Sequence, residues 1–132
     1  MHTSSIDLMS IVSTHIAVRD FIRETTKATD VAVLVPHLEQ LAELLPHHID
    51  QEESKGGFLD AIRQSVPGGS EHVSDLVREH DWFRLELPSL LGAATRYEAD
   101  ALSRVQEFAL RLHEHERLEA RLGVATPDLS NK

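Results

Sequence analysis

Six side chains that commonly bind metals recur in one order along the chain: a histidine, then a histidine with a glutamate four residues later, and then the same again. They are His15, His48, Glu52, His80, His115 and Glu119. On a helix, residues four apart lie on one face with their Cβ atoms about 5 to 6 Å apart, so each His-x-x-x-Glu motif can present both side chains to one metal ion or to a pair of ions. Imidazole and carboxylate donors suit iron and manganese alike.

These residues belong to an internal repeat. Aligning His15 with His80 keeps the neighbouring apolar positions in register. Aligning the second histidine of each set places Glu52 over Glu119. The chain is therefore interpreted as a duplicated helical hairpin, with one set of ligand-type residues in each half.

Four segments carry apolar residues at alternating steps of three and four, which is the period of a helix that buries one stripe in a bundle. They span residues 8–22, 34–52, 73–90 and 105–122, and a histidine of the repeat interrupts each stripe. Polar or glycine-rich breaks separate them, the last at Gly92. We predict an all-α, up-down-up-down four-helix bundle over residues 1–124, with a short extra helical turn at 58–65 and a polar tail at 125–132.

Capping residues and prolines indicate where the helices start and bend. Ser70 is the expected N-cap of the third long helix, and Asp30 or Thr29 is the expected N-cap of the second. Pro46 lacks the N–H that would bond to the preceding turn. The second helix should therefore bend just before His47, unless a short loop interrupts it there.

A bundle built this way would bury two carboxylates, which is costly without a compensating charge. Cations adjoin the apolar stripes at Arg19 and Arg84, which either neutralise carboxylates near the site or extend into solvent. A pair of divalent ions would supply the missing charge. The other histidines lack a matching partner pattern, and we expect them to be solvated or to act as distant hydrogen-bond partners; they are His2, His37, His47, His72 and His113.

Composition narrows the class of protein. The chain has 132 residues, a net charge of −9 and no cysteine, which excludes disulfides and thiolate metal sites. Nucleic acid and anionic membranes are unfavourable partners because no block of basic residues offsets the negative charge. Residues 1–18 have neither the basic start nor the unbroken apolar run of a signal peptide or membrane span, so we expect a cytoplasmic protein.

The order His, His-x-x-x-Glu, His, His-x-x-x-Glu resembles the hemerythrin-like, or HHE cation-binding, family over residues 8–122. The resemblance implies a four-helix bundle around two iron ions joined by an oxo or hydroxo bridge. It also implies that Glu52 and Glu119 bridge the irons and that the histidines are terminal ligands. A manganese or mixed-metal pair is an alternative.

The chain departs from the oxygen carriers of that family in two respects. Those proteins have two histidines four residues apart on the third helix, whereas here Leu76 and Arg84 flank His80 at that spacing. They also carry an aspartate five residues after the fourth-helix histidine, where this chain has Ala120. With one imidazole fewer, each iron would keep an open position, which favours reaction with oxygen or peroxide at both irons over reversible carriage.

Three functions from different classes are compatible with this reading. The first is a di-iron protein that binds and reacts with dioxygen or hydrogen peroxide; if it turns over, it is an oxidoreductase that uses an external reductant. The second is an iron- or oxygen-responsive sensing or interaction module, and the third is a reversible oxygen carrier. An oxygen from Glu53, Glu79 or Tyr97 could fill an open position, but we expect these three residues at the surface.

Overall fold

The computed structural model describes residues 5–123, with side chains from residue 12 onward, and this part of the chain contains helices and no strand. The elements are α1 (Ser5–Lys27), the 3-10 helix η1 (Val31–Leu34), α2 (Val35–Glu53), α3 (Phe58–Ser65), α4 (Gly69–Thr95) and α5 (Ala101–Leu122). The all-α prediction is confirmed, as is the extra helix at 58–65. His2 and the predicted tail at 125–132 lie outside the described residues.

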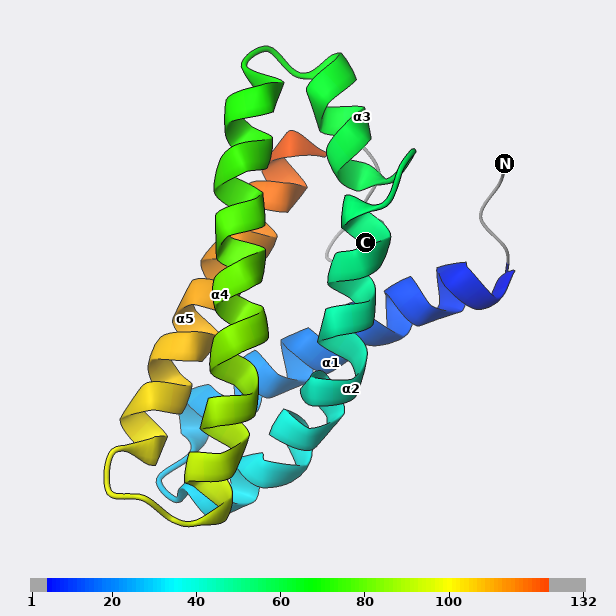
Figure 1. Ribbon diagram of the computed structural model, residues 1–132. Helices are drawn as coiled ribbons and strands as arrows, with labels where there is room; N and C mark the ends of the chain where they lie inside the picture. The colour runs from blue at the N-terminus through cyan, green and yellow to red at the C-terminus, as the bar shows by residue number, and fades with distance from the viewer. Residues whose placement is uncertain (1–4, 124–132) are drawn as a thin grey trace.

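The four long helices contact one another in a ring. α1 packs against α2 and α5, α2 packs against α4, and α4 packs against α5. In Figure 1, α2 and α5 run toward the end of the molecule where α3 lies, α4 runs the opposite way, and α1 crosses the others obliquely. α3 packs on α4 and α2 and closes that end of the bundle. Within residues 5–123, no helix combines the length and the apolar content needed to cross a membrane.

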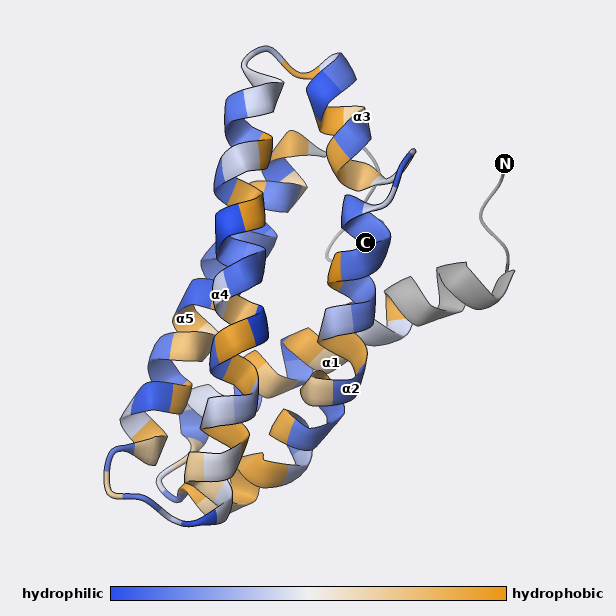
Figure 2. Cartoon of the chain, in the orientation of Figure 1, coloured by the Kyte–Doolittle hydropathy of each residue, from blue (hydrophilic) through white to orange (hydrophobic). Residues whose placement is uncertain are grey.

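The apolar core is divided into two clusters with a polar layer between them. The smaller cluster joins α3 to Val73 and Leu76 of α4. The larger one fills the opposite part of the bundle, where Phe108 makes edge-to-face ring contacts with Phe21 and Phe83 at centroid distances of 6.1 and 5.4 Å. In Figure 2, the hydrophobic residues around α3 and those of the lower half are separated by a largely hydrophilic stretch of α2. The histidines and glutamates of the repeat lie in this interval.

The predicted start of α4 at Ser70 is wrong. The helix begins at Gly69 and has Gly68 as its N-cap. The turn from α3 imposes this start, because Gly68 adopts a left-handed φ of 69° and a Cβ on Gly69 would collide with the carbonyl oxygen of Ile62. Two glycines in a tight turn therefore set the boundary.

The predicted break at Gly92 is also wrong, since α4 continues to Thr95. A single glycine costs a helix about 1 kcal/mol relative to alanine and does not end it. Ala93 and Ala94, which follow it, are fully buried in the larger apolar cluster, so continuing the helix preserves their packing. The chain leaves the helix just before Tyr97, which has a positive φ of 56°.

The predicted cap Asp30 starts the short helix η1 and not α2 itself. Its Oδ1 accepts a hydrogen bond of 2.9 Å from the Ala32 N–H. η1 leads directly into α2, which begins at Val35 with Leu34 as its N-cap and is not interrupted by a loop. Of the two outcomes expected at Pro46, the structure has a single helix that continues through the proline. The histidine and glutamate of the first motif therefore stand on one unbroken helix.

Two alanine substitutions should change stability in opposite directions. Gly68→Ala forces a Cβ into a left-handed conformation and should lower the free energy of unfolding by about 1 to 2 kcal/mol. Gly92→Ala should raise it by up to about 1 kcal/mol, since alanine favours a helix. The added Cβ meets the flexible end of Arg96 at 3.1 Å, which can move away. Urea denaturation measures both changes, and a shift of the same sign in the two variants would contradict this description of the turn and the helix.

Candidate metal centre

All six residues of the repeat are buried in the polar layer between the two apolar clusters. α1 supplies His15, α2 supplies His48 and Glu52, α4 supplies His80, and α5 supplies His115 and Glu119. Their exposed fractions range from 1% to 7%. The helical period explains this, because each residue occupies the inward stripe of its own helix. Each predicted ligand therefore faces the interior.

Four of the six side chains bring their donor atoms together. The Nε2 atom of His80 lies 3.1 Å from Glu52 Oε1 and 3.7 Å from Glu119 Oε2, and the Nε2 atom of His115 lies 3.0 Å from the same Glu119 oxygen. One donor atom from each of these four residues falls within 4.8 Å of the others. Opposite ligands of one metal ion lie about 4.2 Å apart, twice a usual metal–nitrogen length. A small contraction of this cluster would therefore suit one ion.

The remaining two histidines form a second pair beside that cluster. The rings of His15 and His48 are 5.1 Å apart, close to the 4.9 Å between His80 and His115. Glu52 lies between the pairs, since its Oε2 is 3.0 Å from His48 Nε2 while its Oε1 faces His80. We call His80 and His115 the α4–α5 pair, and His15 and His48 the α1–α2 pair. The duplicated sequence thus gives two histidine pairs on either side of a carboxylate.

Several buried donor atoms in this layer have no hydrogen-bond partner among the described residues. They are His15 Nε2, His48 Nδ1 and Nε2, His80 Nε2, Glu52 Oε1 and Glu119 Oε1. Where two of these atoms approach within 3.1 Å, they are not aligned as a hydrogen bond. Leaving a buried polar group unpaired costs about 1 to 3 kcal/mol, and clusters of such groups are rare in native proteins. A bound cation would satisfy the inward Nε2 lone pairs and the two carboxylate oxygens together.

Glutamates on neighbouring helices contact the Nδ1 atoms of three of the histidine rings, on the side away from the interior of the layer. The Nδ1 atom of His80 is 2.7 Å from Glu53 Oε2, and the Nδ1 atom of His115 is 2.6 Å from Glu79 Oε1. The Nδ1 atom of His15 is 3.1 Å from an oxygen of Glu116. When Nδ1 donates its proton to a carboxylate, Nε2 keeps a lone pair for the interior, which is the usual arrangement of metal-binding histidines. We call these three glutamates the outer carboxylates.

The outer carboxylates are the functional residues that sequence reasoning missed. Glu53 and Glu79 were considered as donors for an open metal position but expected at the surface, and Glu116 was not singled out. A signal does exist, because each directly adjoins a residue of the repeat. Consecutive residues of a helix point about 100° apart. A glutamate next to an inward-facing ligand therefore lies at the edge of the buried stripe, where it can reach the adjacent helix. Tyr97 is 67% exposed and stays a surface residue, as expected.

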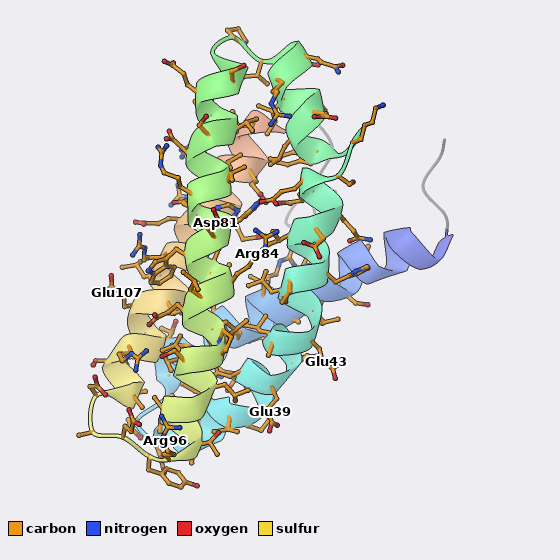
Figure 3. The ribbon with its side chains drawn as sticks, in the orientation of Figure 1. Glu39, Glu43, Asp81, Arg84, Arg96 and Glu107 are labelled. Atoms are coloured by element: carbon orange, nitrogen blue, oxygen red, sulfur yellow. The ribbon has the colours of Figure 1, made fainter. Side chains whose placement is uncertain are left out.

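Arg84 neutralises one outer carboxylate, whereas Arg19 is exposed. The Arg84 guanidinium donates to Glu53 at 2.9 Å and to Asp50 at 3.0 Å, and also pairs with Asp81 on its own helix. Figure 3 shows Arg84 in the space between α4 and α2. The two arginines of the repeat therefore differ: one positions Glu53, and through it the His80 ring, while the other extends into solvent.

The histidines that were expected to lie outside the site do so where the structure describes them. His47 and His113 are exposed, and His37 and His72 are partly exposed. His113 lines a surface groove between α1 and α5 with Thr25 and Gln106. Its position two residues from His115 directs it away from the buried layer, which supports the predicted register of α5.

The charges in the layer favour a bound cation. Burial disfavours the charged form of Glu52, but His48 and His80 outweigh burial and hold the pKa of Glu52 well below its ordinary value. Burial and the charge of Glu52 raise the pKa of Glu119. Burial opposes protonation of His80 and His115, but the adjacent carboxylates outweigh it and raise their pKa values to about 9 and about 10. Without metal, protonated imidazoles balance the carboxylates; metal ions would replace those protons.

No family model, curated protein or solved structure matches this chain. The site therefore stands on its own geometry: a buried group of histidines and glutamates that can hold a metal ion.

Proposed function

We propose that this protein is a non-haem di-iron protein of the hemerythrin-like type that binds and reacts with dioxygen or hydrogen peroxide. The observation that carries the proposal is the buried layer in which three imidazole Nε2 atoms and one oxygen of each glutamate have no hydrogen-bond partner among the described residues. Two histidine pairs beside a shared carboxylate suit two ions better than one. The ring of long helices, with α4 antiparallel to α2 and α5, supports an up-down-up-down topology.

The proposed ligands divide into two sets that share the glutamates. The α4–α5 pair would hold one ion and the α1–α2 pair the other. Glu52 contacts both pairs and would serve both ions. Glu119 contacts the α4–α5 pair, and we propose that it also serves the second ion. Four imidazoles and two carboxylates suit iron, and manganese or a mixed pair is compatible with the same donors. Such a centre supplies reversible binding or reductive activation of oxygen and peroxide.

The chain's own residues would orient the ligands and exclude water. Outer carboxylates fix the ring orientation of three histidines and strengthen them as donors. Phe83 places its ring 5.2 Å from the His115 ring and screens that side of the layer. The two apolar clusters close the layer at both ends. These features favour a protected centre that admits small reactants.

Reaction with oxygen or peroxide is preferred to reversible carriage because α4 contributes a single histidine, His80, to the layer. The oxygen carriers of the family have two histidines four residues apart on that helix. The residues four positions away are Leu76, which belongs to the smaller apolar cluster, and Arg84, which binds Glu53. An open position at each ion would leave both accessible to a reactant. A sensing or interaction module remains the alternative, in which metal binding orders the bundle and thereby its surface.

Metal content and optical spectra together test the proposal. Protein purified without added metal should contain about two iron ions per chain, as in other di-iron bundles. Its spectrum should change on exposure to oxygen or peroxide after reduction, and consumption of the reactant would separate an enzyme from a carrier. A folded protein that neither contains iron nor takes it up would refute the proposal and leave the layer as a polar core network.

A further inference from the structure

The two histidine pairs differ in the carboxylate contacts of their Nε2 atoms, which face the interior of the layer. Both Nε2 atoms of the α4–α5 pair lie within 3.1 Å of a carboxylate oxygen, one from Glu52 and one from Glu119. In the α1–α2 pair, Glu52 Oε2 lies 3.0 Å from His48 Nε2, whereas neither Glu52 nor Glu119 comes within 4.0 Å of a His15 ring nitrogen. The donors that already converge within 4.8 Å are those of the α4–α5 pair and the two glutamates.

The pairs differ again in the contacts of their Nδ1 atoms with the outer carboxylates. Both Nδ1 atoms of the α4–α5 pair contact an outer carboxylate, at 2.7 and 2.6 Å. In the α1–α2 pair, the contact of His15 with Glu116 is longer, at 3.1 Å, and His48 Nδ1 is buried with no partner in the described part of the chain. An imidazole held by an outer carboxylate is a fixed and more basic ligand, and loss of such a partner typically costs about 10- to 100-fold in metal affinity.

The repeat identifies the position at which the second half departs from the first. Glu79, the partner of His115, directly precedes His80. The equivalent residue in the other half directly precedes His15 and is Thr14, which is buried. A threonine hydroxyl carries no charge, so the α1–α2 half lacks the carboxylate that the α4–α5 half has at this position.

We propose that the centre loads in two unequal steps: the position at the α4–α5 pair binds its metal ion first and more tightly, and the position at the α1–α2 pair binds the second ion more weakly. This inference rests on the proposed metal function and adds the order of binding. Because both ions would share Glu52, the first would also orient that carboxylate for the second. Under limiting metal, the protein would hold a single ion between α4 and α5.

Titration of the metal-free protein with Fe²⁺ under exclusion of oxygen tests the order of loading. Isothermal titration calorimetry should resolve two binding steps, whose dissociation constants differ by at least about tenfold. His48→Ala should retain the tight step and lose the weak one, whereas His115→Ala should lose the tight step. Circular dichroism at each stage checks that the variants remain helical.

Substitutions of outer carboxylates provide a test that leaves all six inner residues in place. Glu79→Gln should weaken the tight step by about 10- to 100-fold, and Glu116→Gln should weaken the second step by a similar factor. Glu114 is the matched control, because it adjoins His115 in sequence but is exposed. Glu114→Gln should leave both steps unchanged.

The possible outcomes separate this inference from the proposed function. Two equal steps, or a tight step weakened by Glu116→Gln and not by Glu79→Gln, would overturn the order of loading while leaving a two-metal centre in place. Absence of any bound Fe²⁺ in folded wild-type protein would overturn both. A Thr14→Asp variant that tightens the second step would add support from a gain of affinity, and a tightened first step in that variant would contradict the assignment.

Discussion

Replacing Glu52 with alanine should remove at least one metal ion per chain, and replacing Glu119 should do the same. The Glu52 carboxylate places one oxygen 3.1 Å from His80 Nε2 and the other 3.0 Å from His48 Nε2, so its loss deprives both histidine pairs of a shared donor. Glu119 is 1% exposed and approaches both histidines of the α4–α5 pair. Elemental analysis of each purified variant beside the wild type measures the loss.

The matched control for this experiment is His113→Ala. His113 lies two residues before His115 on α5 but is exposed, so its removal should leave the metal content intact. Wild-type metal content in both glutamate variants would refute their shared role. Loss of metal in His113→Ala together with retention in His115→Ala would show that the register of α5 is wrong.

The two glutamates should also differ from each other when metal is absent. Glu52 is held charged by His48 and His80, and its pKa is lowered, whereas burial and repulsion by Glu52 raise the pKa of Glu119. A neutral glutamine therefore replaces Glu119 at smaller cost than it replaces Glu52. Urea denaturation in the presence of a chelator should show the larger loss of unfolding free energy for Glu52→Gln, although both variants lose metal.

The inward-facing residues could be predicted from the sequence because the helical period alone determines them. A residue three or four positions from buried leucines lies on the same buried face of the helix, whichever helices pack against that face. Hence His15, His48, His80 and His115 are buried as predicted. The break between α3 and α4 was also visible as glycines, although the residue that begins α4 depends on how closely Gly69 approaches Ile62.

The outer carboxylates and the convergence of the donor atoms depend on how the helices pack against one another. The apolar period of a single helix does not predict that packing. Whether Glu79 turns inward or outward is decided by the ring of His115 on the adjacent α5. Likewise, the sequence presents six equivalent ligands, but the donors of four converge within 4.8 Å. His15 stands on α1, which crosses the bundle obliquely. The outer carboxylates of His15, His80 and His115, and the absence of one at His48 among the described residues, therefore emerge only in three dimensions.

Removing the metal should destabilise the protein more at alkaline pH than near neutrality. In the metal-free protein, carboxylates raise the pKa values of His80 and His115 from 6.5 to about 9 and about 10. A raised pKa stabilises the fold fully below the unfolded value of 6.5, and this contribution is lost as pH rises through the folded value. The lowered pKa of Glu52 acts in the opposite sense, since its contribution is present above 4.5 and is lost as pH falls. From these groups, metal-free protein should be most stable between pH 4.5 and 6.5 and should weaken toward pH 9 and beyond.

Bound metal should reverse this trend. The ion takes the place of the protons on the imidazoles, and protons compete with it less as pH rises. With free metal at a thousand times its dissociation constant, each site adds about 4 kcal/mol to the unfolding free energy. Thermal unfolding followed by circular dichroism, with and without chelator at pH 6.5 and 9, measures the gap between loaded and metal-free protein. The gap should widen at the higher pH in the wild type and in His113→Ala, because His113 lies outside the buried layer. A gap that narrows, or metal-free protein that gains stability over this range, would show that protonated imidazoles do not balance the buried carboxylates.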